Sequence, residues 1–125
     1  MEKLEYIPGD LVFHYIPKIT IKKYVKVYVC STNNALSLED MDGNLYDYIG
    51  VLYPIPLTPE ILEKNEWKKL YEKFFEKNVN NIRLTIEFSE NIYVAINRIF
   101  IMEIHYIHEL QHLLFGLGLN SEMEV

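Results

Sequence analysis

The chain has 125 residues, of which 50% are apolar and 24% are charged, and this composition is typical of a globular protein rather than a disordered one. The length favours a single domain over residues 1–125, because two independent cores would each be very small. The formal net charge of -6 argues against a nucleic-acid partner, since such binders usually carry a basic face. The one cysteine, Cys30, excludes an intramolecular disulfide and a cysteine-based zinc knuckle.

Neither a membrane span nor a secretion signal is found in the sequence. No window contains the roughly 20 consecutive apolar residues that a membrane helix needs. The first residues, Met1 to Glu5, are polar and lack the apolar core of a signal peptide. The expected location is therefore the cytoplasm, with no membrane partner.

The first half of the chain is divided by prolines and turn signals into short segments rich in β-branched and aromatic residues. Strands are expected over residues 11–16, 19–30, 35–38 and 46–52. Asn33-Asn34 and Asp42-Gly43 are typical of tight turns between strands. Short strands separated by frequent turns predict a small, strongly bent sheet or a partial barrel.

A change of apolar period at Thr58 predicts a helix in the middle of the chain. Thr58-Pro59-Glu60 combines a hydroxyl N-cap, a proline at the first helical position and an acid in the first turn. Apolar residues at positions 67, 70, 71, 74 and 75 continue at helical spacing. Asn65 either separates two helices or lies inside one, and residues 78–81 end the helical region.

Three strands and a second helix are expected after residue 81. Residues 83–88 and 92–97 form a hairpin around Ser89-Glu90-Asn91, and residues 99–104 form a third strand. A final helix over residues 105–117 ends at its glycines. The expected fold class is α+β: an N-terminal bent sheet or partial barrel, a middle helix, a β-meander, and a C-terminal helix packed on the sheet.

A stretch of lysines lies beside tyrosines in and just before the segment expected to form the second strand. The lysines are Lys18, Lys22, Lys23 and Lys26, and the tyrosines beside them are Tyr15, Tyr24 and Tyr28. Such interleaving is seen in proteins that bind single-stranded nucleic acid. We favour an exposed edge strand, on which lysines prevent aggregation between sheets.

Three of the four histidines gather on one face of the expected C-terminal helix. At 100° per residue, His105, His108, Glu109 and His112 lie opposite the leucine- and isoleucine-rich face. The string His108-Glu109-Leu110-Gln111-His112 matches the His-Glu-x-x-His signature of zinc proteases. A catalytic zinc needs a third protein ligand, and the residues after Leu117 offer only Glu122 and Glu124. His105 would be an unusual third ligand, so we expect no zinc and no other cofactor.

Two phrases of the sequence carry a resemblance over nearly the whole chain. Residues 54–65 read PIPLTPEILEKN and residues 106–113 read YIHELQHL. In this order they resemble a family of small uncharacterised proteins from Bacteroidetes genomes and their phages, whose members carry an "IPLTPE-L" helix start and a C-terminal helix like "YVHQLQNLYFALTG". The family phrase has glutamine and asparagine at the positions of Glu109 and His112. The His-Glu-x-x-His string is therefore interpreted as a coincidence.

The sequence departs from the family phrases in two places. Glu66-Trp67 replaces glycine-phenylalanine, and Gly118-Leu119 replaces threonine-glycine at the end of the last helix. The resemblance does not imply an activity, because none is established for the family. It implies a phage or another mobile element as the setting, where small proteins often counter host defence by binding a host protein or by sequestering a nucleotide-like signal.

These observations predict a non-enzymatic, self-associating binding protein. The preferred partner is a small nucleotide-derived molecule held at a subunit interface; a protein-binding inhibitor of a host factor and a metal-dependent hydrolase are the alternatives. The expected contact residues are His108, Gln111, His112, Phe115 and Arg98. Histidine and glutamine donate and accept hydrogen bonds, an exposed phenylalanine favours a contact, and arginine suits a phosphate. A concave apolar pocket would favour the small ligand, and an exposed aromatic patch without a pocket would favour a protein partner.

Overall fold

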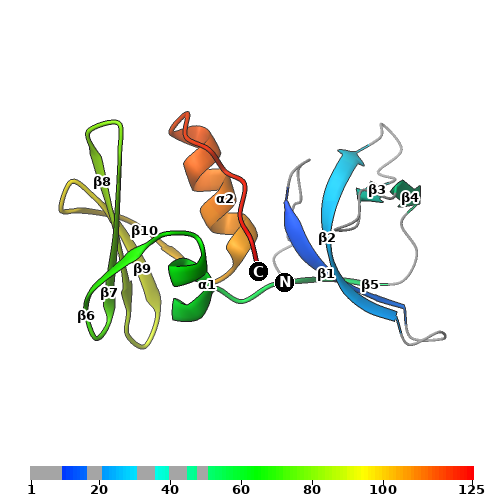
Figure 1. The fold of residues 1–125 in the computed structure, drawn as a ribbon, viewed down its shortest axis with the longest axis horizontal. Helices are drawn as coiled ribbons and strands as arrows, with labels where there is room; N and C mark the ends of the chain where they lie inside the picture. Colours follow the sequence, from blue (N-terminus) through cyan, green and yellow to red (C-terminus); the bar gives the residue numbers. More distant parts are fainter. Residues whose placement is uncertain (1–9, 17–20, 31–35, 40–44, 48–50) are drawn as a thin grey trace. The chain divides into compact units, whose positions relative to one another are not determined.

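The computed structural model describes residues 10–16, 21–30, 36–39, 45–47 and 51–125 (Figure 1). The chain clusters into two compact units, Met1–Ile55 and Pro56–Val125, and each is described by itself. The expectation of a single domain over residues 1–125 stays a prediction. None of the described helices is long and apolar enough to span a membrane.

The first unit contains one five-stranded antiparallel sheet with the strand order β4-β3-β2-β1-β5. Its strands are β1 (Leu11–Ile16), β2 (Ile21–Cys30), β3 (Leu36–Glu39), β4 (Leu45–Asp47) and β5 (Val51–Pro54). These bounds confirm the predicted strand cluster. Among the described strands the sheet is not closed into a barrel.

Two details of the first unit differ from the sequence-based expectations. The strand predicted over residues 46–52 is two strands, β4 and β5, which lie at opposite edges of the sheet. The lysine-rich β2 is not an edge strand, because β1 and β3 pair with its two sides. The turn expected at Asn33-Asn34 lies outside the described residues, as does the one at Asp42-Gly43.

The second unit begins with α1 (Pro59–Lys64), which starts as the sequence predicts. Thr58 is the N-cap, and its Oγ1 accepts a hydrogen bond from the backbone N–H of Ile61 at 3.3 Å. The helix has only six residues and buries Leu62. Asn65 ends it: its Nδ2 donates to the carbonyl of Ile61 at 2.7 Å, and Glu66 follows with a φ of 69°.

The helix predicted over residues 67–75 is wrong, because this segment forms a hairpin. β6 (Lys68–Tyr71) and β7 (Phe74–Val79) pair antiparallel across a two-residue turn. Adjacent residues therefore point to opposite faces: Phe75 is 1% exposed, whereas Phe74 is half-buried. Apolar residues at this spacing fit either one helix or two short strands. The burial of Phe75 in the sheet favours the two strands.

The five strands of the second unit form an antiparallel meander with the order β10-β9-β8-β7-β6. The remaining strands are β8 (Ile82–Phe88), β9 (Ile92–Ile96) and β10 (Ile99–Ile104). Two-residue turns at Asn80-Asn81 and Asn97-Arg98 join neighbouring strands, and all four residues have positive φ. Positive φ at both central residues is required by type I′ turns, whose twist matches that of the strands.

The left-handed backbone of Arg98 predicts a stabilising substitution. Arg98 has a φ of 71°, which costs a residue with a Cβ about 1–2 kcal/mol, whereas glycine adopts it freely. Glycine loses more backbone entropy on folding, so we expect Arg98→Gly to raise the free energy of unfolding by about 0.5–1 kcal/mol. Urea unfolding measures this change. A loss of stability would show that the arginine side chain makes a stabilising contact.

The meander has one buried face, called the inner face, and one exposed face, called the outer face. Phe75, Ile86 and Val94 are paired neighbours on β7, β8 and β9 and at most 1% exposed, so they define the inner face. Figure 1 shows α1 and α2 (Ile107–Gly116) on the same side of this sheet. The element order, with a β cluster, a helix, a meander and a C-terminal helix, confirms the predicted α+β class.

Candidate functional site

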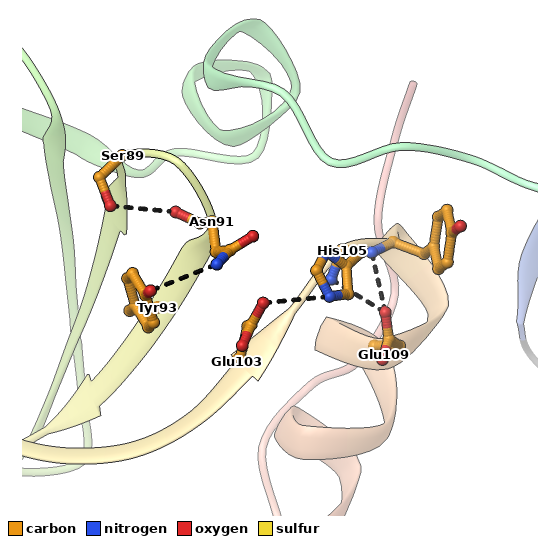
Figure 2. A network of polar contacts seen from close by, with 7 residues as sticks. Ser89, Asn91, Tyr93, Glu103, His105 and Glu109 are labelled. Atoms are coloured by element: carbon orange, nitrogen blue, oxygen red, sulfur yellow. Dashed lines mark hydrogen bonds and ion pairs between the residues drawn. The ribbon is translucent and has the colours of Figure 1, made fainter.

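The glutamate of the His-Glu-x-x-His string caps the helix on which it lies. Glu109 is the third residue of α2, and its Oε1 accepts hydrogen bonds from the backbone N–H groups of His105 at 2.9 Å and Tyr106 at 3.0 Å (Figure 2). These N–H groups precede or begin the first helical turn and have no acceptor within the helix. The carboxylate is thus engaged at the helix start, as in the second half of a capping box.

The two histidines of the string do not share an exposed face. His108 is 2% exposed, and its ring stacks on Tyr106 at a centroid distance of 5.8 Å. His112 is half-buried and meets the His108 ring edge-on at 5.5 Å. The predicted outward position of His108 is therefore wrong. His105 is exposed and lies 3.3 Å from the carboxylate of Glu103 (Figure 2).

Gln111, which was also predicted on the outer side of the helix, is 4% exposed. The chain after α2 folds back along the helix (Figure 1), and Gln111 Nε2 donates to the carbonyl of Ser121 at 3.1 Å. Further along, Asn65 of the α1 cap donates to the carbonyl of Glu124 and accepts from its N–H. The segment after α2 therefore covers a second side of the helix, whereas the helical wheel predicted only one buried side.

No group of three histidine, cysteine or acidic side chains is arranged to hold a metal ion in the described part of the chain. Glu109 is engaged with the helix start, and His108 and His112 contact each other edge-on. The arrangement gives no support to a metal-dependent hydrolase. The expectation that the chain carries no zinc stays a prediction.

The capping role of Glu109 predicts a loss of stability rather than a loss of metal. We expect Glu109→Ala to lower the free energy of unfolding by about 1–2 kcal/mol, because two backbone donors lose their acceptor. Glu122→Ala, an exposed acid beyond the helix, is the matched control and should change it by less than about 0.5 kcal/mol. Melting curves with and without chelator measure both effects. A chelator-dependent melting temperature of the wild type would contradict the prediction.

The five residues predicted to form a contact site lie in different environments. His108 and Gln111 are buried, His112 is half-buried, and Phe115 is 68% exposed near the end of α2. Arg98 is exposed at the turn between β9 and β10. The exposure of Phe115 agrees with a contact role and rules out a core position. A ligand-binding role for the set stays a prediction.

The outer face of the meander carries a row of side chains that sequence analysis missed. Strand register places one residue from each strand side by side: Tyr71, Phe74, Glu87, Tyr93 and Glu103, called here the aromatic–acidic ladder. Directly opposite residues on antiparallel strands project from the same face. Tyr71 is 74% exposed, and the other members are half-buried or exposed. Figure 2 shows Tyr93 and Glu103 projecting from neighbouring strands.

Ring contacts extend the ladder into an aromatic surface. Tyr71 meets Phe74 edge-on at 6.2 Å, and Tyr93 meets Phe100 at 5.7 Å. Phe100 is 61% exposed on β10, and its neighbours Ile99 and Ile101 are 66% and 46% exposed. Period-two alternation would have found this surface only if residues 67–79 had been interpreted as strands.

A hollow of about 400 Å³ lies at the β6 edge of the meander. Its lining mixes both charges: Glu66, Lys68, Leu70, Glu76, Lys77 and Asn78. Lys77 Nζ donates to the carbonyl of Asn65 at 3.1 Å, and Glu76 pairs with Arg83 at 3.3 Å. This charged lining differs from that of a typical small-molecule pocket, which is mostly apolar and has a few convergent polar groups.

Comparisons with protein-family models, with curated proteins and with solved structures find no match to this chain.

Proposed function

We propose that this chain is a non-enzymatic protein-binding protein, and that the outer face of the meander is its contact surface. The observation that carries the proposal is the aromatic–acidic ladder with the exposed Phe100 beside it. Aromatic side chains are enriched in the centres of protein interfaces, where they supply large contact area at a small entropic cost. Contiguous exposed apolar patches mark interaction sites, whereas scattered exposed apolar residues are ordinary on protein surfaces.

A protein partner is better supported than the nucleotide-derived ligand preferred from the sequence. Tyr71 and Phe100, the exposed aromatic residues of the meander, lie on its sheet and do not line the hollow at the β6 edge. The hollow at the β6 edge would place an anionic ligand against Glu66 and Glu76 as well as Lys68 and Lys77. If the chain is phage-encoded, as the resemblance implies, the partner would be a host protein and the chain an inhibitor of it.

Site-specific photocrosslinking in the cells that naturally carry the gene tests this proposal. A photoreactive phenylalanine analogue at Phe100 should give an adduct of one discrete mass, whereas the same analogue at the exposed Glu63 of α1 should not. Tyr93→Ala in the same molecule should suppress the Phe100 adduct, because it removes the neighbouring ring. Adducts that are absent at Phe100, or equal at both positions, would exclude the outer face as the contact surface.

A further inference from the structure

We infer that the partner engages the aromatic–acidic ladder through cationic side chains, arginine above all. This inference rests on the proposed function and specifies the chemistry of the partner. The ladder alternates rings with carboxylates over four of its members, in the order Phe74, Glu87, Tyr93 and Glu103. A cation is the one common side-chain group that is attracted by an aromatic face and by a carboxylate together.

The ladder spacing allows one guanidinium group to meet both kinds of side chain. Opposite residues on neighbouring strands have Cβ atoms about 4.5–5.5 Å apart, and a cation is attracted by a ring centroid within about 6 Å. A guanidinium group above Tyr93 therefore lies within reach of Glu87 on one side and Glu103 on the other. Arginine suits this position better than lysine, because its planar group stacks on a ring while donating to a carboxylate.

The charge of Glu87 is the strongest reason for a cationic partner. Glu87 is half-buried between the rings of its two strand neighbours, and no hydrogen bond or ion pair to its carboxylate is found within the described residues. A cationic side chain of a partner can therefore form a charge-assisted hydrogen bond with this carboxylate without displacing a partner within the described residues. Glu76 and Glu103 on the same face differ, since Arg83 lies 3.3 Å from the first carboxylate and His105 lies 3.3 Å from the second. The outer face thus has one half-buried carboxylate that a partner can neutralise.

The distance between the two carboxylate positions suggests the spacing of the partner's cations. Glu87 and Glu103 lie on β8 and β10, two strand intervals apart, which corresponds to about 9–10 Å. A polyproline II segment places residues i and i+3 on the same side about 9 Å apart. An arginine at every third position of such a segment would therefore match the ladder.

Two other occupants fit the observations less well. Single-stranded nucleic acid stacks its bases on exposed rings, but its phosphates would approach Glu87 and Glu103. A second copy of the chain could pair with the apolar edge strand β10, yet the register of β10 shifts between Phe100 and Met102. A bulge of this kind is one of the devices that prevent edge-to-edge pairing.

Peptide titration with the full chain tests the inference. The probe is a capped peptide, Arg-Pro-Pro-Arg-Pro-Pro-Arg, and its controls carry citrulline, lysine or glutamate in place of arginine. We expect calorimetric binding by the arginine peptide, weaker binding by the lysine peptide, and none by the other two. Glu87→Gln should weaken binding about tenfold, because a charge-assisted contact is lost. Glu90→Gln, which removes the same charge from the exposed turn between β8 and β9, should change it less than about twofold.

The remaining outcomes of these experiments would contradict the inference. Equal binding of the arginine and citrulline peptides would overturn the inference, as would equal effects of Glu87→Gln and Glu90→Gln, or binding of an oligothymidine in place of the peptide. An adduct of twice the chain mass in the crosslinking experiment would identify a second copy as the occupant and would also overturn it. If the peptide fails to bind while the Phe100 adduct with another protein persists, the proposed function stands and the cationic partner is excluded.

Discussion

Replacing Phe75 with alanine is expected to lower the free energy of unfolding by about 3–5 kcal/mol. Phe75 is 1% exposed and lies opposite the fully buried Ile86 on the inner face of the meander, where its ring also meets Phe88 edge-on at 5.7 Å. Alanine would remove the transfer free energy of the ring and leave a cavity that its neighbours fill only in part. Urea or thermal unfolding measures the loss.

Phe74→Ala is the matched control for this prediction. Phe74 precedes Phe75 on the same strand but lies on the outer face, half-buried and in contact with the exposed Tyr71. We expect its loss to cost about 1 kcal/mol and to weaken binding of the arginine peptide, because the ladder loses a ring. Similar stability losses for the two variants would contradict the alternation of β7 and would favour the helix predicted from the sequence.

The segment around Phe74 and Phe75 shows why part of the fold could not be predicted. Apolar residues at positions 67, 70, 71, 74 and 75 fit one face of a helix, and they also fit two short strands joined by a two-residue turn. Local spacing cannot separate these cases, because the decision depends on pairing with β8, and the apolar spacing within residues 67–75 does not report that pairing. The outer-face surface was missed for the same reason, since it exists only when β6 and β7 are strands.

Features determined by neighbouring residues were predicted correctly. The cap at Thr58 needs only a hydroxyl and the following proline, and the hairpin around Ser89-Glu90-Asn91 needs only a polar turn between two alternating segments. The placement of α2 was also correct to within two residues. The buried side of α2 was predicted incorrectly, because a helical wheel assumes that only one face of the helix is covered. The segment ending at Val125 covers another, with contacts at Gln111 and Asn65.

The second large effect is expected at His108, which the sequence placed on the surface and the structure places at 2% exposure. From the sequence, His108→Ala should leave the fold intact and weaken binding or assembly. From the structure, it should lower the free energy of unfolding by about 2–3 kcal/mol, because a buried ring is removed. That ring stacks on Tyr106 and meets His112 edge-on, so the start of α2 loses two contacts together.

Phe115→Ala provides the contrast, since this residue lies on the same helix and is 68% exposed. Its removal should change the free energy of unfolding by less than about 0.5 kcal/mol, whatever it contacts in an assembly. Melting curves compare the two variants, and sedimentation of the wild type and Phe115→Ala tests the expected self-association. If His108→Ala melts like the wild type, the ring does not contribute to the core as its burial indicates. If Phe115→Ala loses several degrees at a concentration where the wild type is monomeric, the exposed position of Phe115 is wrong. A smaller assembly for Phe115→Ala, with an unchanged melting temperature of the monomer, would assign the exposed ring to a subunit interface.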